Sequence, residues 1–340
     1  MGKLAGTPEI SIIVTCYDRK EFLLSALMSI SRQDSPREIY EVIVVKNFAD
    51  DEIDNFSKLQ GYTSIITQTS SQGGLAAEGV IAARGRVLTF LDDDDLFDQA
   101  KISKVREYFS DDRVVFYHNA HRLIDEDGNP KPGYKLKPPG EAIKVTIGSR
   151  LNFKNVLKEN RLYHLGTFYF NLSSISVLRE VAFHKVRLLA QMESRPDDFI
   201  FFASLKSEGC TMIAGTEELT YYREHESASN PEGTREKLIN LKRRHIMGSK
   251  IIADMMEGTP FEFLARSQLV IPKTDLCRLS HDLKGYLGMG FLYYKSQRQS
   301  SFPAVYILTN YLLGLLEAGK NPLFMRIRSK FLSAVGDIRS

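Results

Sequence analysis

The sequence contains few cysteines, no apolar leader and no internal repeat. Its three cysteines, Cys16, Cys210 and Cys277, are odd in number and widely spaced. This usage argues against a disulfide scaffold and indicates a reducing compartment. The first ten residues lack the apolar run that a signal peptide needs. We therefore expect no signal peptide and a cytoplasmic protein.

The sequence also has no apolar run long enough to cross a bilayer. The best candidate, residues 302–319, holds an apolar stretch of about 15 residues, whereas a spanning helix needs about 20. Charge is shared unevenly: residues 231–340 carry 17 Lys and Arg against 9 Asp and Glu, and residues 1–230 carry 28 against 33. A pI near 8.5 without a recognisable binding module gives poor support for a nucleic-acid partner.

What the chain does have is apolar material for a large core, since 43% of its 340 residues are hydrophobic. Short apolar runs typical of buried strands occur at 10–17, 40–48, 63–68 and 86–91. Apolar residues recur at helical spacing over 22–33. A turn at Gly73 and Gly74 leads into a second helix of small residues at 75–85. This order predicts an α/β fold with a mainly parallel sheet.

Four consecutive aspartates, 92–95, follow the last of these strands. Carboxylates this close repel one another unless a cation lies among them. Because side chains alternate along a strand, we expect Asp92 and Asp94 to point one way and Asp93 and Asp95 the other. Oxygen ligands of this kind suit Mg²⁺ or Mn²⁺, with water and phosphate completing the coordination. The alternative is a solvated acidic loop without a metal.

Polar clusters follow three of the predicted strands, at 15–18, 46–51 and 92–95. The carboxyl ends of parallel strands meet at one edge of a sheet, and open α/β sheets bind their ligands there. The three clusters therefore predict a nucleotide-type site on this rim.

Several segments together resemble family-two inverting glycosyltransferases with the GT-A fold. The segments that resemble the donor half of that family are 11–33, 41–50 and 72–97. Those that resemble its mid-chain hairpin, acidic catalytic helix and closing segment are 125–135, 194–209 and 221–229. They occur in the same order and at suitable spacing, and the resemblance covers roughly residues 9–229.

The resemblance implies a GT-A sandwich, nucleotide-diphospho-sugar transferase-like and related to the Rossmann fold, with a C-terminal α-helical extension. It places a catalytic domain at 1–229, with the donor half at 9–98 and the acceptor half at 99–229. Residues 230–340 form the helical region. The amphipathic pattern of residues 236–256 and 302–319 agrees with helices there.

The resemblance also implies a metal-dependent transfer of sugar, with inversion, from a UDP- or GDP-sugar to an acceptor hydroxyl. The acceptor expected is a glycan or a lipid-linked molecule, as in the assembly of glycans, lipid-linked oligosaccharides or glycoconjugates. The donor-binding residues that it implies are Thr15, Tyr17, Asn47, Asp92 and Asp93. The ligands that it implies for Mn²⁺ or Mg²⁺ are Asp92, Asp94 and His225.

Two of the expected donor-binding residues, Tyr17 and Asn47, follow the first and second predicted strands. Tyr17 stands where an aromatic ring can stack on a nucleobase, and its alternative is a half-buried residue at a strand end. Asn47 stands where relatives commonly carry an aspartate, with Lys46 in place of a second acid. An amide still hydrogen-bonds a base edge or a sugar hydroxyl. Asp50 or Asp51 is expected to supply the missing carboxylate.

The general base is expected at the start of a helix. Pro196 suits the first helical turn, and Asp197 and Asp198 suit its N-terminus, where the helix dipole favours negative charge. The resemblance assigns the base to Asp198, the second acid of the pair. The alternative is that both acids only complement the dipole.

The basic region 230–340 and the enzyme class each leave alternatives open. The charge and the apolar helical faces of residues 230–340 suit either peripheral contact with the inner face of the cell membrane or a homodimer surface.

Two rival functions are a phosphotransferase of the haloacid dehalogenase type and a catalytically idle, interaction-only relative. The first places its Asp-x-Asp after the first strand rather than the fourth. The second conflicts with intact Asp92, Asp94 and Asp198.

Overall fold

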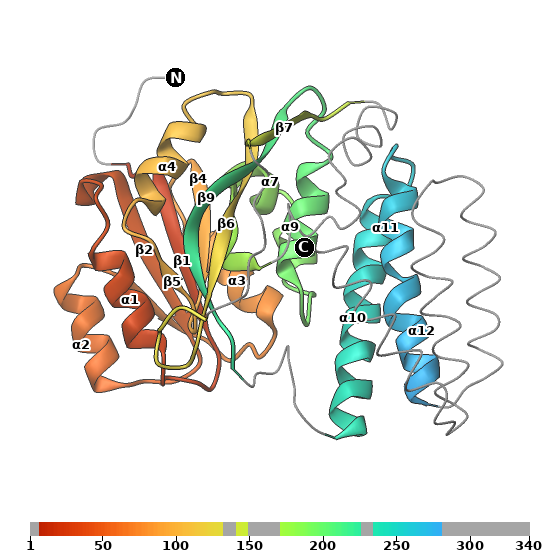
Figure 1. Cartoon of the computed structure of the whole chain (residues 1–340), viewed down its shortest axis with the longest axis horizontal. Helices are drawn as coiled ribbons and strands as arrows, with labels where there is room; N and C mark the ends of the chain where they lie inside the picture. The colour runs from red at the N-terminus through yellow and green to blue at the C-terminus, as the bar shows by residue number, and fades with distance from the viewer. Residues whose placement is uncertain (1–6, 132–140, 149–170, 226–233, 281–340) are drawn as a thin grey trace. The chain divides into compact units, whose positions relative to one another are not determined.

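The computed structural model describes residues 7–131, 141–148, 171–225 and 234–280 (Figure 1). The chain divides into two compact units. The first contains residues up to 230 together with 254–261, and the second contains 231–253 and the residues after 261. Each unit is described by itself.

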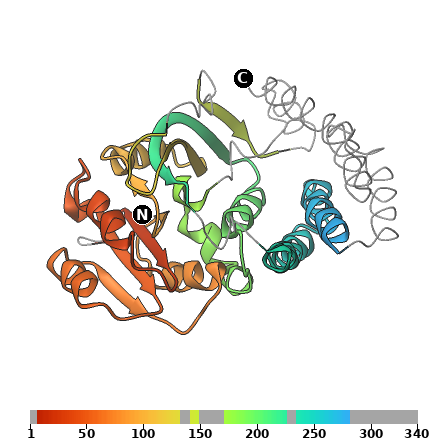
Figure 2. The ribbon, with the colours of Figure 1, turned by 60° about the horizontal axis from the view of Figure 1, so that its bottom comes forward.

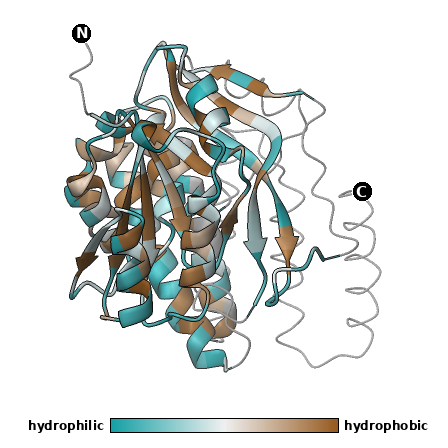
Figure 3. Cartoon of the chain, turned by 90° about the vertical axis from the view of Figure 1, so that its left-hand side faces the viewer, coloured by the Kyte–Doolittle hydropathy of each residue, from teal (hydrophilic) through white to brown (hydrophobic). Residues whose placement is uncertain are grey.

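The first unit is built on one sheet with the strand order β3-β2-β1-β4-β8-β6-β9-β5. Its parallel half consists of β1 (Ile10–Cys16), β2 (Tyr40–Lys46), β3 (Thr63–Ile66) and β4 (Val87–Asp92). β1, β2 and β4 are apolar and buried on both faces, whereas the edge strand β3 is largely exposed. The ribbon in Figure 3 is coloured by hydropathy and shows hydrophobic residues along the sheet. The predicted α/β fold is confirmed, but the prediction of a mainly parallel sheet holds only for these four strands.

The other half of the sheet is mixed. Its strands are β5 (Leu96–Phe97), β6 (Val114–Ile124), β7 (Ile143–Thr146), β8 (Ile175–Leu178) and β9 (Thr211–Arg223). β8 runs antiparallel between β4 and β6, and β9 runs parallel to β6 and antiparallel to β5 and β7. The long β9 ends beside the aspartates that follow β4, so the two halves of the sheet share one rim.

Helices flank the sheet. They are α1 (Leu23–Ser31), α2 (Asp51–Leu59), α3 (Gln72–Ala82), α4 (Lys101–Tyr108), α7 (Arg179–Phe183), α8 (Val186–Leu189) and α9 (Pro196–Ser204), with the short 3₁₀ turns η1 (Arg37–Ile39) and η2 (Leu172–Ser174). α9 is buried on nearly every side: Phe199, Phe201 and Phe202 are fully enclosed. A helix so enclosed holds its first turn in a fixed place.

Two local predictions were wrong. Gly73 and Gly74 do not form a turn; they lie in the first turn of α3, where the Ser71 side chain accepts a hydrogen bond from the Gly74 amide. A Cβ on Gly73 would lie 2.2 Å from the carbonyl oxygen of Leu189, so the glycine permits close packing rather than a bend. The sequence pattern also missed α2, which is short and largely polar.

The described part of the second unit is helical, as expected. It consists of α10 (Arg235–Met255), α11 (Glu262–Gln268) and α12 (Val270–Leu279). An ion pair of 2.7 Å between Lys242 and Asp275 joins α10 to α12, which lie side by side in Figure 2. The helix expected at 302–319 lies outside the described residues. None of the helices in the described parts of the chain combines the length and apolar character needed to span a membrane.

Candidate active site

The predicted rim is formed by the ends of β1, β2 and β4. In the sheet register Thr15 lies opposite Asp92, and Cys16 lies opposite Lys46. The Thr15 hydroxyl donates to Asp92 Oδ1 at 3.1 Å. The polar ends of the first, second and fourth predicted strands therefore lie side by side at this rim.

The aspartates do not alternate as predicted. β4 ends at Asp92, and a turn follows in which the Asp95 amide donates to the Asp92 carbonyl at 3.2 Å. Within this turn Asp93 and Asp94 converge: one nitrogen of Arg19, Nη2, lies 2.6 Å from Asp93 Oδ1 and 2.6 Å from Asp94 Oδ2. The prediction failed because the period-two rule holds only inside a strand.

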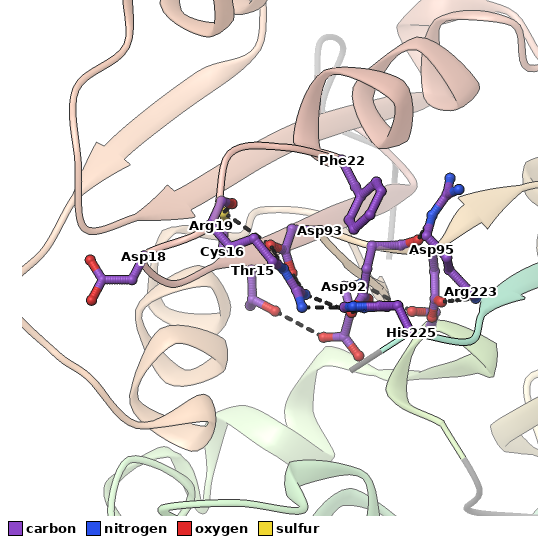
Figure 4. A network of polar contacts seen from close by, with 12 residues as sticks. Thr15, Cys16, Asp18, Arg19, Phe22, Asp92, Asp93, Asp95, Arg223 and His225 are labelled. Carbon is purple, nitrogen blue, oxygen red and sulfur yellow. Dashed lines mark hydrogen bonds and ion pairs between the residues drawn. The ribbon is translucent and has the colours of Figure 1, made fainter. Parts of the chain in front are cut away.

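Arg19 is the main site residue that sequence reasoning missed. Its Nε and Nη2 bind Asp93 as a fork, at 3.0 and 2.6 Å, while Nη2 also binds Asp94 (Figure 4). A signal existed: a basic residue directly after β1 must lie near the end of β4, because the two strands are neighbours. Arg19 therefore shares its one positive charge between two of the four aspartates.

His225 lies in the same cluster, as the resemblance implied. Its Nε2 is 2.9 Å from Asp94 Oδ2 and 3.2 Å from Arg19 Nη1. Its ring packs against Phe22 with centroids 5.2 Å apart. The β9 strand also holds the turn, because the Arg223 guanidinium donates to the Asp94 carbonyl at 2.8 Å. Residues from the beginning and the end of the domain sequence thus meet at Asp94.

Burial and mutual repulsion disturb the ionisation of these carboxyls. Burial, with the charges of Asp94 and Asp93, raises the pKa of Asp92 to about 8. Burial also raises the pKa of Asp93 and Asp95. The pKa of Asp94 is lowered although burial opposes this, because the hydrogen bond from His225 and the charge of Arg19 favour the carboxylate. Asp94 is therefore the best-prepared anion of the four.

These residues fit a divalent cation. Carboxylate oxygens and an imidazole nitrogen are ligands that Mn²⁺ accepts, and an added cation would offset the repulsion that raises the pKa of Asp92. Within the described residues, no group of three or more His, Cys, Asp and Glu is already assembled as a metal cage. A metal here depends on further ligands such as water or phosphate.

The rim at the ends of β1 and β2 contains a pair that the sequence did not predict. The Asp18 amide donates to Asn47 Oδ1 at 2.8 Å, and Asn47 Nδ2 donates to Asp18 Oδ1 at 3.1 Å. Asp18 has a left-handed φ of +53° and points away from the aspartate cluster (Figure 4). Tyr17 beside it is 43% exposed, so its ring is open to a ligand.

The carboxylate expected to replace an acid at position 47 does not come from Asp50. Asp50 caps α2 by accepting from the Glu52 and Ile53 amides, and it also binds Lys20. Lys46 is fully buried and pairs with Asp54 at 2.9 Å. The carboxylate that lies against Asn47 is that of Asp18.

The helix α9 presents the acids expected to supply the base. Asp198 is 2% exposed, and its carboxylate forms an ion pair with Arg195, which has a left-handed φ of +60°. Burial raises the pKa of Asp198 to about 6, opposed by the Arg195 charge, and burial with the Asp198 charge raises the pKa of Asp197 to about 7. The charge of Asp197, at the start of α9, contributes to the raised pKa of Asp92.

The sequence matches a known protein family. The model described as glycosyl transferase family 2 matches residues 11–182, about half of the sequence. The chain belongs to glycosyl transferase family 2. The predicted family is therefore confirmed.

Relatives and solved structures agree with this assignment. A poly(ribitol-phosphate) beta-glucosyltransferase of Bacillus spizizenii is 25% identical over 167 residues, which cover 45% of this chain but only 26% of that protein. S. aureus TarS 1-349 in complex with UDP-GlcNAc matches 80% of this chain and 81% of its own, with 12% identity and a TM-score of 0.51. The mannosyltransferase PcManGT of Pyrobaculum calidifontis, in complex with GDP-Man and Mn2+, matches 96% of this chain and 80% of its own, with 13% identity and a TM-score of 0.51. The predicted GT-A fold is confirmed.

A buried network of hydrogen bonds centred on Ser173 supports the aspartate turn of this family 2 protein. The Ser173 hydroxyl accepts from the Asp92 amide at 3.0 Å, and the Ser173 carbonyl accepts from Lys101 Nζ at 3.2 Å and Thr220 Oγ1 at 3.0 Å. Lys101 also donates to Asn119 Oδ1. This network could not be predicted from the sequence, because its residues come from α4, β6, η2 and β9, which are far apart along the chain.

Proposed function

We propose that this protein transfers a sugar from a nucleotide-sugar donor to an acceptor hydroxyl. The observation that carries the proposal is the pairing of two acidic groups on one rim. A buried aspartate turn with an adjacent histidine follows β4, and α9 begins with two acids, Asp197 and the buried Asp198, of which Asp197 contributes by its charge to the raised pKa of Asp92. Charge stabilisation for a leaving diphosphate and a base for the attacking hydroxyl are the two requirements of this reaction.

The donor side of the proposal uses the aspartate turn. Asp92, Asp94 and His225 hold Mn²⁺ or Mg²⁺, which supplies Lewis-acid neutralisation of the leaving nucleoside diphosphate when bound. Mn2+ in the PcManGT complex supports this choice. Thr15 and Asp93 line the donor site in this proposal. Thr15 contacts Asp92 of the turn, and Asp93 contacts Arg19.

The nucleoside lies on the outer rim in this proposal. The exposed ring of Tyr17 stacks on the base, and Asn47, oriented by Asp18, hydrogen-bonds the base edge or the ribose. The donors named in the similar structures, UDP-GlcNAc and GDP-Man, support a UDP- or GDP-sugar.

The acceptor side uses Asp198 as general base. Its carboxylate takes the proton of the acceptor hydroxyl while the oxygen attacks the anomeric carbon and the diphosphate leaves from the opposite face. One displacement inverts the configuration. Arg195 keeps Asp198 charged and oriented despite its burial. The chemistry belongs to residues 1–229, and the relative that acts on poly(ribitol-phosphate) supports a glycan or glycopolymer acceptor.

The test is a panel of UDP- and GDP-sugars measured by thermal shift with and without Mn²⁺. One donor should raise the melting temperature, and more so with the metal. Asp94→Asn should remove the extra shift given by Mn²⁺, because a neutral amide binds the cation poorly. Asp112→Asn is the matched control, since its carboxylate is 97% exposed and distant from the turn in the fold. Absence of any donor shift in the unaltered protein would favour the idle, interaction-only alternative.

A further inference from the structure

Arg19 lies on the same atoms that the proposed function assigns to the metal. Its Nη2 is 2.6 Å from Asp94 Oδ2, and its Nη1 is 3.2 Å from His225 Nε2. Nη2 and Nε also bind both oxygens of Asp93, at 2.6 and 3.0 Å. The guanidinium is therefore anchored on Asp93 and extends over the two candidate ligands.

A guanidinium and a divalent cation compete for Asp94 Oδ2. Arginine stays protonated at all relevant pH values, so its charge cannot be removed to make room. Its proximity to two carboxylates raises the pKa of Arg19 further still. A metal ion that binds alone must displace Arg19 from Asp94 and accept a positive neighbour close by, which lowers its affinity.

The side chain of Arg19 is freer to move than its backbone. Its backbone is held on both sides, because Cys16 Sγ donates to the Arg19 carbonyl at 2.7 Å and the Asp18 amide is bound by Asn47. Its side chain is 28% exposed, whereas that of Asp93 is 8% exposed. Any movement of Arg19 is therefore a rotation of its side chain, while its backbone and its partner Asp93 stay in place.

We propose that Arg19 couples metal binding to donor binding: it occupies Asp94 until a diphosphate arrives, and then turns onto that anion. The inference rests on the proposed function, because it takes Asp94 and His225 as the metal ligands. The diphosphate provides the negative charge that Arg19 loses on leaving Asp94, so metal and nucleotide each strengthen the binding of the other. Such coupling is reciprocal between the two ligands.

The experiment measures Mn²⁺ affinity directly, by the loss of the free Mn²⁺ signal in electron paramagnetic resonance. Titrations use Mn²⁺ alone, and Mn²⁺ with UDP or with GDP after correction for the metal–nucleotide complex in solution. The variants are Arg19→Gln, which removes the charge, and Arg19→Lys, which keeps it. Lys20→Gln is the matched control: it removes an equal charge from the next residue, whose ammonium binds Asp50 at 2.9 Å outside the cluster. Circular dichroism verifies that all four proteins are folded.

We expect Arg19→Gln to bind Mn²⁺ alone about tenfold more tightly than the unaltered protein, within the 5- to 150-fold range typical of coupling between sites. The gain in Mn²⁺ affinity caused by nucleotide should shrink by the same factor. Arg19→Lys and Lys20→Gln should behave like the unaltered protein with Mn²⁺ alone.

Two results would overturn the inference while leaving the proposed function intact. In one, Arg19→Gln binds Mn²⁺ alone equally or less tightly, which makes Arg19 a structural brace for the turn. In the other, Arg19→Lys binds as tightly as Arg19→Gln, which removes charge as the cause. If no variant binds Mn²⁺ with or without nucleotide, the metal site of the proposed function fails and the inference fails with it.

Discussion

Replacing Lys101 by methionine should change how the stability of this protein depends on pH. Lys101 is fully buried and donates to Asn119 Oδ1 and the Ser173 carbonyl, both neutral oxygens, with its ammonium 5.0 Å from the centre of the Phe97 ring. Burial lowers the pKa of its ammonium from 10.5 to about 7. Methionine retains most of the apolar stem and removes both the charge and the hydrogen bonds.

The sign follows from the protons bound in each state. Between pH 7 and about 10 the unfolded chain holds the Lys101 proton and the folded protein does not, so the free energy of unfolding rises with pH. One proton contributes at most about 1.4 kcal/mol per pH unit, which gives a rise of about 2 kcal/mol from pH 7 to pH 9. Lys101→Met lacks this rise. It also leaves Asn119 Oδ1 unpaired, at a pH-independent cost of about 1–3 kcal/mol.

The assay is urea unfolding at pH 7, 8 and 9, followed by circular dichroism because the chain has no tryptophan. Only the difference in pH slope between the two proteins is interpreted, since the aspartates of the turn titrate in both. Lys104→Met is the control on the same helix: Lys104 is partly exposed and pairs with Glu107 at 2.8 Å. Equal slopes for the unaltered protein and Lys101→Met would refute the reasoning, because Lys101 would then stay charged when folded.

Three predictions concern the base. Asp198→Asn keeps the shape of the side chain but cannot accept a proton, so turnover should fall by about 10²–10⁴-fold while donor affinity by calorimetry stays the same; near-normal turnover would assign the base elsewhere. Because the pKa of Asp198 is about 6, kcat/KM should fall about tenfold per pH unit below that value. Arg195→Gln removes the charge that favours ionised Asp198, so this acid limb should move to higher pH, and an unmoved limb would show that Arg195 does not tune the base.

The sequence alone determined the four strands β1 to β4 and the rim at which their polar ends meet. The apolar runs that became β1, β2 and β4 are too continuous for half-exposed strands, so their burial in a parallel sheet could be predicted, and with it the rim where the polar clusters meet. Pro196 followed by two acids likewise predicted the start of α9, because this is a local preference of helix N-termini.

Tertiary structure decided how the charged groups are paired. The partners of Arg19 lie 74 and 75 residues away at Asp93 and Asp94, and His225 reaches Asp94 across 131 residues. No local pattern specifies contacts at such separations. They arise because β1 lies beside β4, and because β9 returns to the same edge of the sheet.

The same reason explains the direction of the aspartates. Where β4 ends is set by its neighbours in the sheet, and the turn after Asp92 is held by the Arg223 side chain from β9 and the Ser173 hydroxyl from η2. Composition and spacing could place four carboxylates at a strand end. Only the packing of distant segments around them determined which two share Arg19 and which one has a lowered pKa.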